Sequence, residues 1–68
     1  MLSKTKMRVL GRVFDAEVSS AFNAATSHLV HLRSKSAKEL WAEGYLDHVG
    51  NNLYQLTNLG RFAYCSWC

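Results

Sequence analysis

The stretch from Glu43 to Arg61, EGYLDHVGNNLYQLTNLGR, constrains the fold more than any other part of this 68-residue chain. Two runs within it, YLDHV and LYQLT, alternate apolar and polar residues on either side of GNN. Such runs joined by a short loop of Gly and Asn are typical of a two-stranded β-hairpin. Gly44, before the first run, permits the positive φ that ends a helix, and Thr57, after the second run, is a favoured N-cap. We therefore expect a helix, a hairpin and another helix in succession.

Apolar residues at helical spacing predict further helices upstream of the hairpin. The first runs from Thr5 to Phe14 and carries basic residues on its outer face. A short second helix is expected in AEVSSAFN, residues 16–23, where Asn23 can adopt the left-handed conformation that ends a helix.

A third helix is expected from Thr26 or Ser27 to Ala42, with a final helix over residues 58–68. An alternative stays open for the third helix. Arg33 interrupts its apolar side, so the segment can break there and restart at SAKE, which matches the Ser-x-x-Glu capping box. The expected fold is a single domain over residues 1–68, mainly α with a small β-hairpin, in the order helix, helix, helix, hairpin, helix.

This order, with LWAEGYLDHV leading into LYQLTNLGR, resembles the winged helix-turn-helix domains of small bacterial and phage DNA-binding regulators. In that family the recognition helix commonly ends in Leu-x-x-x-Gly followed by two hydrophobic residues, matched here by Leu40, Gly44, Tyr45 and Leu46. The wing commonly runs into Leu-Thr-x-x-Gly-Arg, matched by the residues from Leu56 to Arg61. The resemblance implies a winged helix whose third helix reads double-stranded DNA and whose hairpin is the wing.

The distribution of charge agrees with a polyanionic partner. The net charge is +3, and residues 1–38 hold seven Lys and Arg against two acids, whereas residues 39–68 hold one Arg against three acids. On a continuous third helix, polar and cationic residues share the outward face, as expected for contacts with phosphates and base edges. The candidate DNA-binding residues are Ser27, His31, Arg33, Ser34, Lys35 and Lys38, with Asn51 and Asn52 on the wing. The alternative for this face is an ordinary solvated helix surface.

Three aromatic residues in the last seven are more than one small core would normally absorb. Phe62, Tyr64 and Trp67 are therefore candidates for an interface, either with a second copy of the chain or with another protein. The alternative is that Phe62 and Trp67 close the base of the core. The leading hypothesis is a small DNA-binding regulator that forms a homodimer through its C-terminal helix. The rival hypothesis is a module or phage-type inhibitor that binds a host protein instead of DNA.

Two pairs of potential metal ligands, His28 with His31 and Cys65 with Cys68, have the spacing that can reach one zinc ion. The gap between the two pairs is much longer than in common zinc motifs, so we expect no metal and no cofactor, and two reduced thiols.

No set of nucleophile, base and orienting group can be named in the sequence, and no enzymatic activity is expected. A small core can hardly spare the roughly 300 Å³ that a drug-sized ligand needs. No apolar run reaches the ~18 residues of a membrane span, and the N-terminus lacks a secretory signal, so the expected compartment is the cytoplasm.

Overall fold

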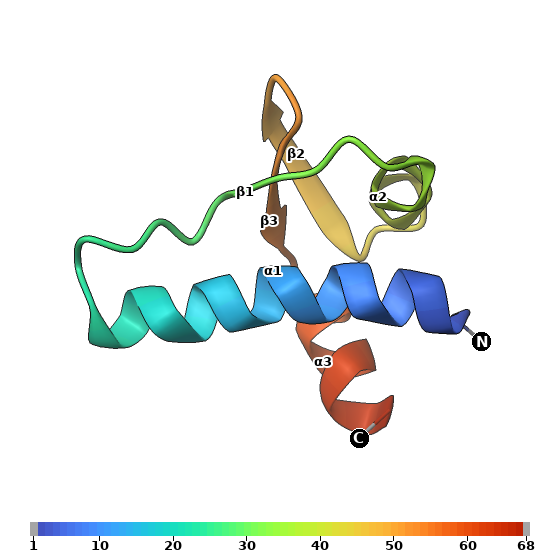
Figure 1. Cartoon of the computed structure of the whole chain (residues 1–68). Helices are drawn as coiled ribbons and strands as arrows, with labels where there is room; N and C mark the ends of the chain where they lie inside the picture. The colour runs from blue at the N-terminus through green and yellow to red at the C-terminus, as the bar shows by residue number, and fades with distance from the viewer. Residues whose placement is uncertain (1, 68) are drawn as a thin grey trace.

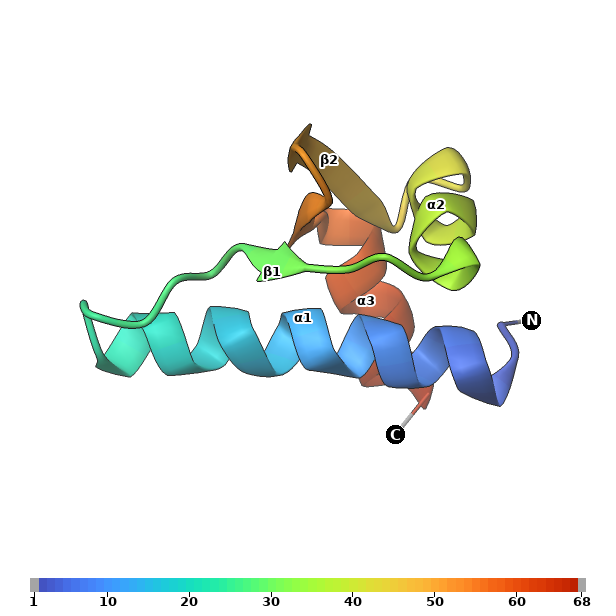
Figure 2. The ribbon, with the colours of Figure 1, turned by 45° about the horizontal axis from the view of Figure 1, so that its top comes forward.

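The computed structural model describes residues 2–67, with only the backbone for Trp67. The described residues form three helices and a three-stranded antiparallel sheet, in the order helix, strand, helix, strand, strand, helix. The helices are α1 (Lys4–Phe22), α2 (Lys35–Ala42) and α3 (Asn58–Trp67), and the strands are β1 (Val30–His31), β2 (Leu46–Gly50) and β3 (Leu53–Leu56). The hairpin and α2 lie on one side of α1, which α3 crosses at a steep angle (Figures 1 and 2).

The first and second expected helices form one helix, so the prediction of separate helices was wrong. Ser3 caps α1 by accepting a hydrogen bond from the Lys6 backbone N–H (3.2 Å), and no proline interrupts the 19 residues that follow. Asn23 ends the helix with φ −140°, not in the left-handed conformation expected for it. Its side chain instead accepts from the Ala25 N–H (3.0 Å), which turns the chain back along α1.

The prediction of a long third helix was also wrong. The alternative prediction, a break near Arg33, is closer to the structure. Ser27 accepts from the Leu29 N–H through its hydroxyl (3.1 Å), a local bond that competes with helix formation. Val30 and His31 then pair with Tyr54 and Leu53 of β3. The chain becomes helical only after Ser34, whose hydroxyl accepts from the Ala37 N–H (3.3 Å). The restart falls two residues before the expected Ser36.

The hairpin expected from the alternation is present, with β3 as the central strand of the order β1-β3-β2. Leu46 pairs with Leu56 at its base, and the register shifts between His48 and Gly50 near its tip. Asn52 in the turn has φ 58°, a conformation that Asn adopts more readily than most residues.

Glycine and threonine fix the joint between α2, the hairpin and α3. Gly44 has φ 88°, as expected for the residue that ends a helix. The Thr57 hydroxyl donates to the carbonyl oxygens of Gly44 (2.7 Å) and Tyr45 (3.0 Å), and it accepts from the Gly60 N–H (3.0 Å). A Cβ at Gly60 would lie 2.1 Å from the Tyr45 carbonyl oxygen, so only glycine lets α3 approach this closely. The Thr and Gly of the Leu-Thr-x-x-Gly pattern thus hold the start of α3 against the backbone that follows α2.

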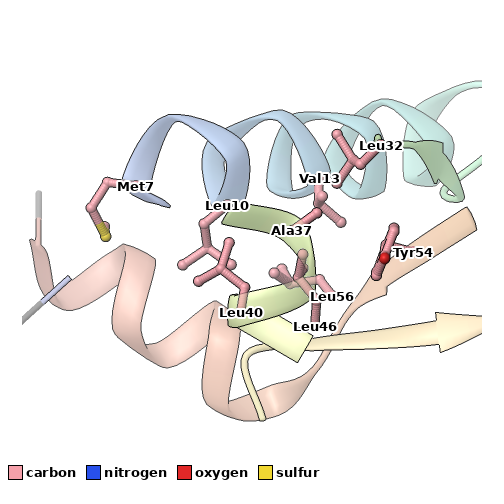
Figure 3. Packing of buried hydrophobic residues seen from close by; sticks show 9 residues of the cluster. All are labelled: Met7, Leu10, Val13, Leu32, Ala37, Leu40, Leu46, Tyr54 and Leu56. Carbon is pink, nitrogen blue, oxygen red and sulfur yellow. The ribbon is translucent and has the colours of Figure 1, made fainter. Parts of the chain in front are cut away.

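A single apolar core lies between α1, α2 and the sheet, and its buried residues come from α1, α2, β2, β3 and the segment that follows β1 (Figure 3). Its centre consists of Leu10 and Val13 from α1, Leu40 from α2, Leu46 from β2 and Tyr54 from β3. Met7, Leu32, Ala37 and Leu56 complete it. Ala63 and Tyr64 of α3 pack against this cluster from outside. Within residues 2–67, no helix is both long and apolar enough to cross a bilayer.

Candidate functional site

The start of α2 carries three cationic side chains that the sequence singled out. Arg33 and Lys35 flank Ser34, the N-cap of α2, and Lys38 lies one turn further along the helix. All four residues are exposed. Ala37 and Leu40, on the opposite side of α2, are fully buried and hold the helix against the core. The cationic face is therefore directed outwards by the same burial that anchors the helix.

Ser27 and His31 do not share a helix with these cations, because both precede α2 in the chain. Ser27 lies in the exposed turn after α1, away from the start of α2 along the chain. His31 is exposed on β1, opposite Leu53 at the start of β3. The expected single face from Ser27 to Lys38 is thus divided between a turn, a strand and a helix.

The turn of the hairpin lies beside the segment that leads into α2. The Leu32 N–H donates to the Asn52 carbonyl oxygen (2.8 Å), which fixes the chain between His31 and Arg33 against the hairpin turn. Asn51 is exposed, and Asn52 is half-buried. The structure therefore brings together two groups of predicted site residues, those around α2 and those on the hairpin.

An aromatic series links α2 to the hairpin, and the sequence analysis missed it. The Trp41 ring meets the His48 ring edge-on at 5.0 Å between centroids, and His48 stacks on Tyr54 at 4.9 Å. Trp41 is 48 % exposed and lies one turn beyond Lys38. The i, i+3 spacing of Lys38 and Trp41 could have predicted that Trp41 lies beside the cationic residues, because this spacing places two residues next to each other on one helix surface.

Some of the Lys and Arg side chains form ion pairs with acidic residues, and the others do not. Lys6 pairs with Glu43 (3.1 Å), and Arg61 pairs with Glu17 through two hydrogen bonds. Hydrogen bonding from Arg61 is the main reason that the pKa of Glu17 lies below its ordinary value. Within residues 2–67, the other six Lys and Arg form no ion pair. Three of them surround the start of α2, and the other three, Lys4, Arg8 and Arg12, lie along α1.

The predicted interface residues of the C-terminal helix do not all face outwards. Phe62 is 71 % exposed, and Leu59 on the same side of α3 is 49 % exposed. Tyr64 is half-buried and packs on the Phe14 ring with centroids 4.9 Å apart. The Trp67 side chain and Cys68 lie outside the described residues, and Cys65 has a free, exposed thiol. In the part of the chain that the structure describes, no three His, Cys, Asp or Glu side chains gather as a metal site would require.

The chain was compared with protein-family models, curated proteins and solved structures, and none of them matches. The candidate site therefore stands on its own geometry.

Proposed function

We propose that the protein binds double-stranded DNA through the start of α2 and the turn of the hairpin. The observation that carries the proposal is the cluster of Arg33, Lys35 and Lys38 at the capped start of α2. These three cations are exposed and have no acidic partner among the described residues, and Arg33 directly follows Leu32, whose N–H donates to Asn52 in the hairpin turn.

The chemistry of this surface suits a nucleic acid. Lys and Arg side chains neutralise phosphates, whereas short polar side chains such as that of Asn51 reach base edges. An α-helix with its side chains is about 10–12 Å across, which fits the width of about 12 Å of the major groove. The Ser34 hydroxyl accepts the Ala37 N–H as the cap of α2 and keeps its own hydrogen, which it can donate to a phosphate beside the neighbouring cations.

The resemblance of the sequence to winged helix-turn-helix regulators supports the same proposal. In this proposal α2 is the reading helix, the β2–β3 hairpin is the wing, and the protein regulates transcription by occupying its site. The hairpin turn carries Asn51 and Asn52 and no Lys or Arg, so most of the electrostatic attraction comes from α2.

A salt titration tests the proposal directly. Binding of the protein to a fluorescently labelled 20-base-pair duplex is measured by anisotropy at several salt concentrations. Three neutralised phosphates predict a slope of about −2.7 for the logarithm of the association constant against the logarithm of salt. Absence of binding at low salt, or binding with no salt dependence, contradicts the proposal.

A second candidate function, protein binding through α3, is favoured by one observation. Among the described side chains of α3, Phe62 is the most exposed large apolar one, and Leu59 extends the same surface. We propose a second copy of the chain as the partner, because a symmetric pair doubles the phosphate contacts and matches an inverted repeat. A host protein bound at this surface is the competing outcome, and DNA binding is then absent.

A further inference from the structure

A pocket of about 370 Å³ lies between α1 and α3, and no residue of α2 lines it. Six residues of α1 and Tyr64 of α3 line it. We name it the α1–α3 pocket. Its volume lies in the range of sites for small organic ligands. The expectation that so small a chain has no room for such a site took account of the core alone, whereas this pocket is formed at the surface where two helices cross.

The floor of the α1–α3 pocket is apolar, and a glycine shapes it. Met7, Gly11 and Tyr64 line the inner side of the pocket. Met7 and Gly11 are buried, and Tyr64 is half-buried. A Cβ at Gly11 would lie 3.0 Å from the Tyr64 ring, so glycine at this position allows the ring to lie close against α1. A ligand held here would contact hydrophobic surface on its inner side.

The rim of the pocket is cationic. Lys4, Arg8 and Arg12 lie at i, i+4 and i+8 on α1, which places them on one side of the helix. Like charges at this spacing destabilise a helix, and within residues 2–67 no acidic side chain pairs with any of the three. Among the described residues, Asp15 is the only acid that lines the pocket, and it stands at one end. The uncompensated charge therefore attracts an anion.

We propose that the α1–α3 pocket binds a small organic anion, a molecule with an apolar body and a carboxylate, sulfonate or phosphate group. The apolar body lies against Met7 and Tyr64, and the anionic group lies between Arg8 and Lys4 or Arg12. Arginine suits this role because its planar fork of donors matches such oxyanions. The proposal does not depend on DNA binding, because none of the residues around the start of α2 lines this pocket.

The probe for the test is 8-anilinonaphthalene-1-sulfonate, an apolar molecule with one anionic group whose fluorescence rises on binding. We expect saturable binding of one probe per chain. The neutral analogue N-phenyl-1-naphthylamine has the same apolar body without the sulfonate, and we expect it to bind at least fivefold more weakly. Equal binding of the two probes, or binding that does not saturate at one per chain, overturns the proposal.

Variants then locate the bound probe. Arg8→Gln with Arg12→Gln should weaken binding at least fivefold, whereas Lys35→Gln with Lys38→Gln removes the same charge elsewhere and should change it less than twofold. Asp15→Asn should strengthen binding while the stoichiometry stays at one probe per chain. Because a loosened core also binds this probe and keeps its far-ultraviolet circular dichroism, the near-ultraviolet spectrum of each variant establishes that its side chains remain packed. Equal effects of the two double variants, or weaker binding by Asp15→Asn, overturn the assignment to this pocket.

Discussion

Arg61 on α3 holds the carboxylate of Glu17 on α1 in a two-pronged ion pair, with Nε donating to Oε2 at 2.9 Å and Nη2 donating to Oε1. The two residues are 44 positions apart in the chain, and their contact ties the last helix to the first. Arg61 belongs to the Leu-Thr-x-x-Gly-Arg pattern, whose other members fix the start of α3 at the hairpin joint. The pattern therefore secures α3 at two places, and its roles in this protein are structural.

The pair between Glu17 and Arg61 predicts a specific loss of stability in acid. The pKa of Glu17 is lowered on folding, so its contribution is fully present above pH ~4.5 and is lost as the pH falls through the lower folded-state value. Both side chains are at least one third exposed, so water screens the pair, and we expect Glu17→Gln to cost about 0.2–1 kcal/mol at pH 7. Urea unfolding at pH 7 and pH 3 should show a smaller difference between the two pH values in the variant than in the parent.

Asp15→Asn is the matched control, because it also removes one carboxylate from α1 but breaks no ion pair among the described residues. If both variants lose the same free energy of unfolding at pH 7, the effect comes from the change in net charge and not from the loss of the pair with Arg61.

Gly60→Ala should be among the most destabilising single substitutions in this chain. The added Cβ would come within 2.1 Å of the Tyr45 carbonyl oxygen, which is backbone and cannot move aside without opening the joint. We expect a loss of about 3 kcal/mol or more, at the upper end of the range for overpacked sites. Gly50→Ala is the control, because a Cβ there would meet only Leu53 at an ordinary 3.8 Å. Thermal unfolding of the two variants measures the difference, and similar melting temperatures would show that the joint yields easily.

The elements around this joint were predictable because local chemistry specifies them. The alternating hydrophobicity of β2 and β3, Gly44 at the end of α2 and Thr57 before α3 are all visible in the sequence. The rest depends on tertiary contacts. Val30 and His31 form a strand only because they pair with the free edge of β3. Two residues are too few to show a periodic pattern in the sequence, so this strand could not be predicted. The helix α1 continues through Asp15, between the two expected helices, because no proline or glycine interrupts residues 12–22.

The candidate site was predicted in part for the same reason. Arg33, Lys35 and Lys38 could be found from charge alone, and their exposure follows from the burial of Ala37 and Leu40. The contact of Trp41 with His48 and the pocket beside Arg8 depend on how α2 meets the hairpin and how α3 crosses α1. Periodicity within one element carries no information about such crossings.

Ser34→Ala tests where α2 begins. The Ser34 hydroxyl accepts the Ala37 N–H at the first turn of α2, and loss of an N-cap costs about 1 kcal/mol. Ser27→Ala removes a hydroxyl that serves only an exposed turn, and we expect a loss of less than ~0.5 kcal/mol. Chemical denaturation of both variants gives the comparison. A larger loss at Ser27 would favour the long helix expected from the sequence over the observed α2.

Phe62→Ala should shift any dimer towards monomer without unfolding the chain, because the side chain is 71 % exposed and aromatic residues dominate many interfaces. Phe22→Ala is matched in chemistry and is even more exposed, at 88 %, but it lies at the end of α1. Sedimentation velocity at micromolar concentration distinguishes the two. A monomeric parent protein excludes the dimer, and equal effects of both variants would show that α3 is not the specific interface.

The central claim, that the start of α2 binds DNA, is tested most directly by comparing two double variants in the salt titration. Lys35→Ala with Lys38→Ala removes two cations at α2, and Lys4→Ala with Arg8→Ala removes two from α1, so both variants have the same net charge. We predict that the α2 variant binds a random duplex at least tenfold more weakly at low salt and that its salt slope falls by about two phosphate contacts. The α1 variant should keep most of the affinity and the slope of the parent. Equal losses in the two variants, or a greater loss in the α1 variant, would contradict the assignment of α2 as the DNA-binding helix.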